Sequence, residues 1–266
     1  MRAAWYDEQG PAAEVLRVGD LPAPEPRVGE VRVRLHVSGI NPGDTKKRVD
    51  RFGLGMPFAR VVPHSDGSGV IESVGEGVDV ARVGQRVWVY GAQSYRPFGT
   101  AAQLTVVPAE QAVELPEEVS DEVGACLGIP GITAHRAVFG DGPSPARRCL
   151  YTASSAAWAR SLHSSRAGAV RRSSQLCGVG ATSRRSTRSW PRTWANVTIR
   201  LLGSDDFPLA AKREAASALT TAARDGALSI RTAEPLPLDR IAEAHDRVDA
   251  GARERVLISL PLGDSR

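Results

Sequence analysis

Cysteine is scarce in this chain of 266 residues, with three scattered residues, Cys126, Cys149 and Cys177. So few cysteines exclude a disulfide scaffold and a structural zinc lobe, and they suit a reducing compartment. There is no apolar run long enough to span a bilayer, and the N-terminal MRAAWYDEQG lacks the apolar region of a secretory signal. We therefore expect a cytoplasmic protein without a membrane partner, folded as one large domain or two modest ones.

Acidic residues and lysine are missing from one long segment. Between Asp141 and Asp205 there is no Asp, Glu or Lys, but there are eleven of the 34 Lys and Arg residues of the chain. The net charge of +4 therefore comes from this segment, because acids outnumber bases elsewhere. Clustered arginine favours phosphate and would suit a binder of nucleic acid or another polyanion. Since the segment contains no recognisable nucleic-acid module, we expect no nucleic-acid partner.

A Gly-rich phosphate-binding turn is also missing. A dinucleotide site needs such a turn between a strand and a helix, so that backbone N–H groups meet the pyrophosphate. Residues 142–204 contain no G-x-G-x-x-G after a strand, and GVGATS from Gly178 follows no β-like run. The 63 residues here are also too few, because a doubly wound sheet needs on the order of 120.

Short strands separated by glycine and proline are what the first 125 residues do contain. The alternation in VRVRLHV (Val31–Val37) is typical of a half-buried strand, and three further strands are expected in Gly69–Gly75, Arg86–Gly91 and Thr100–Pro108. Such spacing predicts an all-β region, a small barrel or sandwich. The residues expected to be largely buried on these strands are Val31, Val33, Leu35, Val70, Val87 and Val89.

Helical patterns follow. We expect two helical pieces in Val119–Gly140, with Ser120 as N-cap and Pro130-Gly131 as the break. Beyond the arginine-rich segment, Asn196–Ser204 predicts a strand, and Asp205 or Asp206 is expected to cap a helix that ends at Asp225-Gly226. An amphipathic helix is expected in Leu238–Gly251 and a closing strand in Arg255–Pro261.

Four stretches in a fixed order carry a resemblance to a known family. They are GINPGDTKKR (Gly39–Arg48), PHSDGSGVIESVGEGV (Pro63–Val78), GQRVWVYG (Gly84–Gly91) and GIPGITAHRAVF (Gly128–Phe139). Together they resemble the zinc-independent quinone oxidoreductases, the zeta-crystallin-like group of the medium-chain dehydrogenase/reductase superfamily. The order and spacing of the four stretches are more specific than any one of them.

The resemblance implies an α/β fold, with a GroES-like β-barrel catalytic domain and, in this chain, a degenerate, shortened Rossmann-type region. The implied division is a GroES-like part in 1–125, a degenerate cofactor-binding region in 126–204, and C-terminal helices with a strand returning to the catalytic domain in 205–266. It further implies NADPH as cofactor, hydride transfer to a quinone or activated alkene as reaction, and a homodimer paired through the strand matching Asn196–Leu202. Because the sheet around that strand is shortened, we expect the dimer to be impaired and the chain to aggregate.

Asn41, Asp44 and Thr133 are the candidate residues for binding substrate or cofactor, and no catalytic side chain is assigned. By resemblance, Asn41 lies in the loop lining the nicotinamide and substrate cleft, and Thr133 matches a hydroxyl that contacts nicotinamide. The alternatives are an Asn-Pro turn for Asn41, a helix cap for Asp44 and a capping role for Thr133.

No metal ligands are expected. In zinc-dependent relatives a Cys lies in the loop matching Asn41–Asp44, and a His directly precedes the acid matching Asp66. Here the loop has no Cys and Ser65 takes the place of the His, with His64 one position away. We interpret His64 as a structural or exposed loop residue, and without a Lewis acid alcohol oxidation is not expected.

A shifted reading frame accounts for the unusual segment. If codons are formed from the last base of one residue and the first two of the next, Trp158-Ala159 gives glycine whatever the codons. With GC-rich choices at the free positions, Cys149 to Arg166 becomes approximately LHGVLGGVGSLAAQLA, a strand end, a Gly-rich turn and a helix start. We interpret the segment as a frameshifted, shortened remnant of the cofactor domain, and we expect 143–194 to be poorly packed. The competing hypothesis is a catalytically inactive product of a damaged gene that retains only the GroES-like domain.

Overall fold

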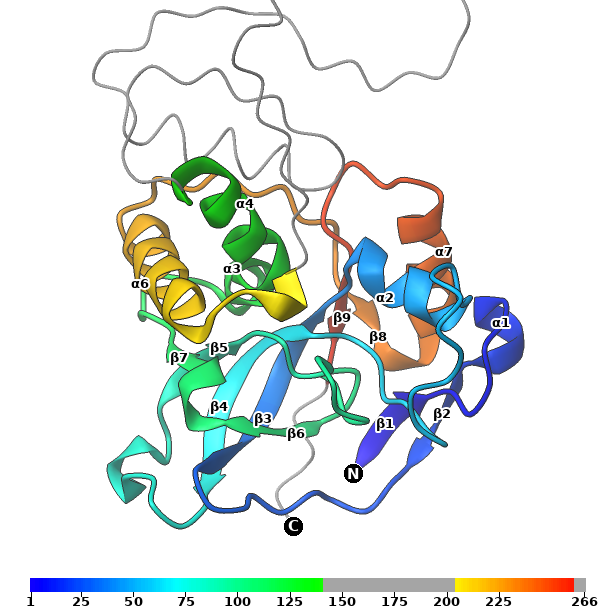
Figure 1. Cartoon of the computed structure of the whole chain (residues 1–266), viewed down its shortest axis with the longest axis horizontal. Helices are drawn as coiled ribbons and strands as arrows, with labels where there is room; N and C mark the ends of the chain where they lie inside the picture. The colour runs from blue at the N-terminus through cyan, green and yellow to red at the C-terminus, as the bar shows by residue number, and fades with distance from the viewer. Residues whose placement is uncertain (141–203, 261–266) are drawn as a thin grey trace, which may run out of the picture.

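The computed structural model describes residues 1–140 and 204–260 as a mixed α/β structure (Figure 1). The segment 143–194 and the expected strand at 196–204, apart from its last residue Ser204 in η4, lie outside the described residues. The N-terminal elements are β1 (Arg2–Trp5), α1 (Ala12–Val15), β2 (Arg17–Asp20), β3 (Glu30–Gly39), α2 (Pro42–Arg48), β4 (Asp66–Val74), η1 (Val80–Arg82), β5 (Arg86–Val89), β6 (Leu104–Pro108), η2 (Ala109–Gln111) and β7 (Ala112–Glu114). The later ones are α3 (Asp121–Leu127), α4 (Ile129–Phe139), η4 (Ser204–Asp206), α6 (Leu209–Arg224), β8 (Leu236–Pro237), η5 (Leu238–Arg240), α7 (Ile241–Asp249) and β9 (Leu257–Ser259).

A mostly antiparallel sheet organises the described part of the chain. Its strands run in the order β7-β5-β4-β3-β9-β8, and β6 pairs with the first half of β3. The expected strands are confirmed, but the all-β interpretation of residues 1–125 is wrong, because α1 and α2 interrupt it. Gly69 of β4 shows why glycine punctuates these strands, since a Cβ there would overlap the backbone oxygen of Arg34 on β3.

The two helices after β7 begin where local chemistry allows. Ser120 caps α3 by accepting the backbone N–H of Val123 at 3.4 Å, as expected. The expected break at Pro130-Gly131 is wrong: the chain breaks at Gly128, and Pro130 and Gly131 lie in the first turn of α4. Proline is compatible with a first helical turn, because the N–H it lacks has no intrahelical acceptor there.

The C-terminal elements return to the N-terminal sheet. The expected helices and closing strand are present as α6, α7 and β9, and α6 ends at Arg224, directly before Asp225-Gly226. The expected cap by Asp205 or Asp206 is wrong, because these residues form η4 and Pro208 precedes α6. β9 pairs with β3 over Val37–Gly39, so this C-terminal strand lies against the first long strand of the chain (Figure 1).

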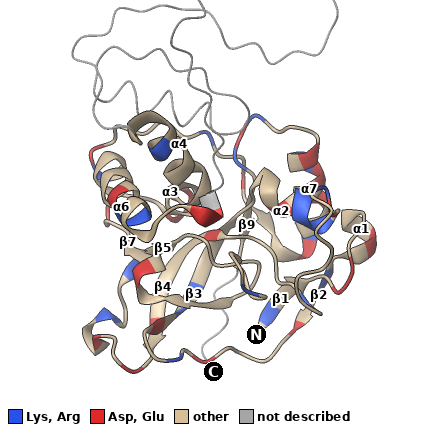
Figure 2. Cartoon of the chain, viewed as in Figure 1, with Lys and Arg blue, Asp and Glu red and all other residues tan. Residues whose placement is uncertain are grey.

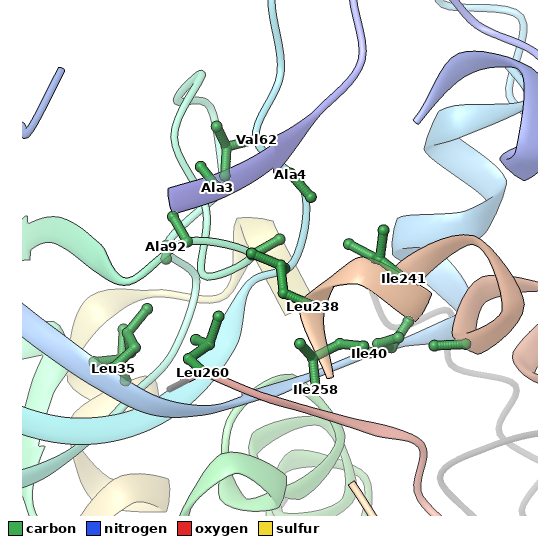
Figure 3. Packing of buried hydrophobic residues seen from close by; sticks show 14 of the residues in the cluster. Ala3, Ala4, Leu35, Ile40, Val62, Ala92, Leu238, Ile241, Ile258 and Leu260 are labelled. Carbon is green, nitrogen blue, oxygen red and sulfur yellow. The ribbon is translucent and has the colours of Figure 1, made fainter. Parts of the chain in front are cut away.

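Two apolar clusters form the core. One lies between the sheet, β1 and α7, and Figure 3 shows Leu35, Ile40, Ile258 and Leu260 within it. The other lies around Trp88, where residues of α3, α4 and α6 pack against the sheet. Of the six residues expected to be largely buried, five are fully so, and Val70 is partly exposed.

Leu35→Ala is expected to lower the free energy of unfolding by about 2–5 kcal/mol, because the side chain is 1% exposed and its loss leaves a cavity. Urea unfolding followed by tryptophan fluorescence measures this. Val28→Ala is the matched control, since Val28 is 71% exposed and its loss should change stability by about 0.5 kcal/mol or less. Equal losses in the two variants would contradict the assignment of this core.

Basic and acidic residues alternate along the described elements, as the colouring of Figure 2 shows. Many of them pair, for example Arg60 with Asp7 at 2.7 Å and Arg86 with Asp121 at 3.0 Å. Among the helices that the structure describes, none is long and apolar enough to cross a membrane.

Candidate functional site

The N-terminus of α2 places Asn41 and Asp44 side by side at the end of β3. The backbone N–H of Asn41 donates to Asp44 Oδ2 at 2.7 Å, and the Asp44 N–H donates to the Asn41 carbonyl at 2.9 Å. Pro42 occupies the first helical position, where its fixed φ favours the helix. Asp44 thus makes the helix-capping contact that was one of its two alternatives, and both side chains are buried.

Asp66, the first residue of β4, joins two helix N-termini. Its carboxylate accepts a hydrogen bond from Asn41 Nδ2 at 2.7 Å and one from the backbone N–H of Ile129, at 2.9 and 3.0 Å from its two oxygens. Gly128 precedes α4 and has no side chain to cap it, so Asp66 supplies the cap from another element. A Cβ at Gly128 would overlap this carboxylate.

Arg255, just before β9, completes the cluster. Its Nη2 donates to Asn41 Oδ1 at 2.9 Å, so both ends of the Asn41 amide are engaged and its orientation is fixed. Arg255 Nε is buried and has no hydrogen-bond partner among the described residues. An unpaired buried donor is costly, and a bound acceptor would offset that cost. Arg255 was not among the predicted site residues, although it is a basic residue at the start of the predicted closing strand Arg255–Pro261.

Burial controls the protonation of the two carboxyl groups. Desolvation raises the pKa of Asp66 to about 7, although its bonds to Asn41 and Ile129 oppose the shift. Desolvation also raises the pKa of Asp44 to about 6, against the bond from Asn41 and the charge of Lys47. Folding therefore favours the protonated acids, and their contribution to stability falls as pH rises from about 4 through these values.

Thr133 lies one turn into α4. Its hydroxyl donates to the carbonyl oxygen of Ile129 at 2.6 Å, four residues earlier in the same helix. The capping alternative is therefore wrong, since Thr133 is inside the helix. Through Ile129 and Asp66, however, α4 and its Thr133 are tied to the same cluster as Asn41.

His64 is buried, with φ of 75°, and belongs to the interior of the domain. Its Nδ1 lies 2.9 Å from the Ser38 hydroxyl and its Nε2 lies 2.9 Å from His245 Nε2. His64 therefore has the structural role that was expected for it, and the alternative of an exposed loop residue is wrong.

The fit of this cluster to a dinucleotide is partial. Asn41, Thr133 and Arg255 would be the residues near the nicotinamide half, and the unpaired Arg255 Nε suits an acceptor. The phosphates need a Gly-rich strand–turn–helix, and within 1–140 and 204–260 no glycine occupies such a turn. The described residues therefore offer one unpaired donor for an acceptor group and provide no cradle for phosphates.

Comparison with known proteins identifies relatives of this part of the chain. Residues 27–117 match the alcohol dehydrogenase GroES-like domain family. The quinone oxidoreductase of Mus musculus is 38% identical over 142 residues, which are 52% of this chain and 40% of the mouse protein. The chloroplast envelope quinone oxidoreductase homolog of Arabidopsis thaliana is 30% identical over 163 residues, 58% of this chain and 49% of that protein. These matches confirm the GroES-like domain.

A solved mycobacterial quinone oxidoreductase has the same overall fold. It superposes with a TM-score of 0.67 at 21% identity, covering 98% of this chain and 100% of that chain. By sequence, the chain spans about 40% of the length of the mouse and rat relatives it matches.

Proposed function

We propose that this chain, whose N-terminal half belongs to the zinc-independent quinone oxidoreductases of the medium-chain dehydrogenase/reductase superfamily, is an oxidoreductase of the NADPH:quinone reductase type. Its substrate would be a quinone or an activated alkene. NADPH, when bound, would supply a hydride, and the protein would supply orientation. The observation that carries the proposal is the cluster at Asp66, which ties the Asn41 loop, α4 and the returning C-terminal strand together.

Asn41, Asp44, Thr133 and Arg255 have distinct proposed roles. Asn41 and Thr133 would line the nicotinamide side of the cleft, and Arg255 would meet an acceptor on the cofactor through its unpaired Nε. Asp44 shapes the Asn41 loop, because its side-chain contact is with the Asn41 backbone. The proposal includes the division into 1–125, 126–204 and 205–266, with cofactor binding in the middle part, and cytoplasmic residence.

We further propose that turnover is impaired in this chain. The sequence between Asp141 and Asp205 contains no phosphate-binding turn after a strand and is too short for a full cofactor domain. The alternative, an inactive product that keeps only the GroES-like domain, shares this impairment. The two hypotheses differ in whether the middle segment is a remnant of a cofactor domain. Sequencing the gene and restoring the reading frame can test this.

Titration of the purified chain with NADPH, followed by nicotinamide fluorescence, is expected to show weak binding or none, with little reduction of a quinone. The reason is the missing contact between backbone N–H groups and the pyrophosphate. The same titration on a protein with the shifted frame and the missing length restored should give saturable binding, a soluble dimer and quinone-dependent NADPH oxidation.

Two results would decide against parts of this proposal. Ordinary enzyme turnover by the chain as it stands would refute the impairment. Failure of the frame-restored, soluble protein to bind NADPH would refute the reductase assignment.

A further inference from the structure

Two histidines far apart in sequence meet in the core. His64 precedes β4 and His245 lies on α7, and both residues are 0% exposed. Their Nε2 atoms are 2.9 Å apart, which is hydrogen-bonding distance. Such a contact requires one ring to donate a proton and the other to accept it.

The neighbours of the pair fix which ring does which. Arg48 Nε, which can only donate, lies 3.3 Å from His245 Nδ1, so that nitrogen accepts. A neutral His245 therefore carries its proton on Nε2 and donates it to His64 Nε2. A neutral His64 then carries its proton on Nδ1 and donates it to the Ser38 hydroxyl at 2.9 Å.

The same order follows from the other end. The Thr100 hydroxyl donates to the carbonyl oxygen of Asp66 at 2.6 Å, because a carbonyl only accepts. Ser38 Oγ, 2.8 Å from Thr100 Oγ1, can thus donate to Thr100 while it accepts from His64. The chain of bonds from Arg48 to Asp66 has one consistent arrangement of protons, with both imidazoles neutral.

An additional proton has no place in this chain. On His245 Nδ1 it would face the N–H of Arg48, and on His64 Nε2 it would face the N–H of His245. If the His245 proton moved from Nε2 to Nδ1, it would face the N–H of Arg48 instead. Burial lowers the pKa of His245 to about 3 and lowers that of His64 well below its usual value, with the neighbouring His245 adding to the latter shift.

The surrounding charges do not compensate for a proton on the pair. Arg48 from α2 is itself a buried cation, paired with Asp249 of α7 at 3.0 Å. Tyr6, directly after β1, interacts with Arg48 and with Asp44 of α2, and burial favours the neutral form of Tyr6 and of Asp44. Ser38 of β3 and Thr100 contact this chain of bonds through uncharged groups, their two hydroxyls and the backbone N–H that Thr100 donates to the His64 carbonyl.

The pair also ties together parts of the fold that matter for the candidate site. α7 packs against α1, α2, β8 and β9. α2 carries Asn41 at its start and Arg48 at its end, and the segment after α7 brings Arg255 to Asn41. The chain of bonds ends on Asp66, whose side chain holds the Asn41 amide.

We propose that the His64–His245 pair is an acid-operated latch that holds α7 on the sheet domain and opens when an imidazole takes up a proton. Opening exposes both rings, which then bind protons below their ordinary pKa of about 6.5. The stabilisation of the closed position of α7 by the histidine pair is therefore complete at neutral pH, and it is lost as pH falls through about 6. The latch is independent of the proposed reductase activity, since it is built from residues that hold α7.

Hydrogen exchange of the full chain, measured by mass spectrometry at pH 7.5 and 5.5 and corrected for intrinsic rates, tests the latch. Protection of peptides from α7 is expected to fall about tenfold for each histidine, about a hundredfold in all. Protection of β3, which is lost when the whole domain opens, should change much less. Opening the whole domain also exposes Asp44 and Asp66, whose raised pKa values make acid stabilise the folded state and so oppose the effect of the two histidines.

Substitutions assign the effect to the pair. His64→Gln/His245→Gln should lose the hundredfold fall, whereas His135→Gln, a buried histidine of α4 outside the chain of bonds, should retain it. Should the double variant not fold, His245→Gln alone should reduce the fall to about tenfold. A full fall in a folded His245→Gln variant, equal falls in α7 and β3, or no fall in the unsubstituted chain would each overturn the proposal.

Discussion

Asp66→Ala is expected to lower the free energy of unfolding by about 2–6 kcal/mol, because two buried donors lose their acceptor. The change removes the acceptor of the Asn41 amide and the cap on Ile129, and each buried donor left unpaired costs about 1–3 kcal/mol. Urea unfolding at pH 7, with circular dichroism to follow the helices, measures the loss.

Asp79→Ala is the matched control for this substitution. Asp79 also caps a helical turn, accepting the N–H of Ala81 at 2.9 Å, but it does so at the exposed start of η1. Its loss should cost about 1 kcal/mol or less. If the Asp66 variant lost no more than the Asp79 variant, the linking of two helix N-termini by Asp66 would not be a stabilising feature.

Gly128→Ala is expected to lower the free energy of unfolding by about 1–3 kcal/mol or more, because the new methyl group would overlap the buried Asp66 carboxylate. The same substitution at Gly43, inside α2, meets no atom within 4 Å. Gly43→Ala should instead stabilise the protein by about 0.4–1 kcal/mol by restricting the unfolded chain. Opposite signs in the two unfolding experiments would confirm the prediction.

Combining Gly128→Ala with Asp66→Ala separates this overlap from a general loss of stability. With the carboxylate gone, the methyl group at position 128 has room, so the double variant should lose less than the sum of the single losses. Strict additivity would show that the effect of Gly128→Ala does not come from its contact with Asp66.

The sequence predicted those parts of the fold that depend on local patterns. The alternation in Val31–Val37 gave a strand with the expected face buried, and Ser120 gave a helix start, because both signals act over a few residues. The break between α3 and α4 was misplaced by two residues. The break lies at Gly128 because the Asp66 carboxylate, 62 residues earlier in the chain, caps α4. The helix can therefore follow a glycine that has no capping side chain.

The sequence supplied candidate residues for the site, but it did not supply the contacts between them. Asn41, Asp44 and Thr133 were identified from their motifs, and the structure links all three to one cluster. Arg255 and the His64–His245 contact were missed, because they join residues separated by 214 and 181 positions. Pairing of that kind depends on β9 and α7 returning to the first sheet, for which no local pattern in the sequence provides a signal.

The chain leaves the described body at the end of α4 and re-enters it at η4, and these two elements contact each other (Figure 1). The two points at which the described structure stops and resumes are therefore close together. For any chain segment that connects two fixed points, the entropy of closure grows only with the logarithm of the segment's length, about 0.6 kcal/mol for each doubling. Evolution can lengthen, shorten or rewrite the sequence between these two points with little thermodynamic penalty to the GroES-like body. A frameshift confined to this interval would thus escape the selection against unfolding that removes such lesions from the rest of the gene.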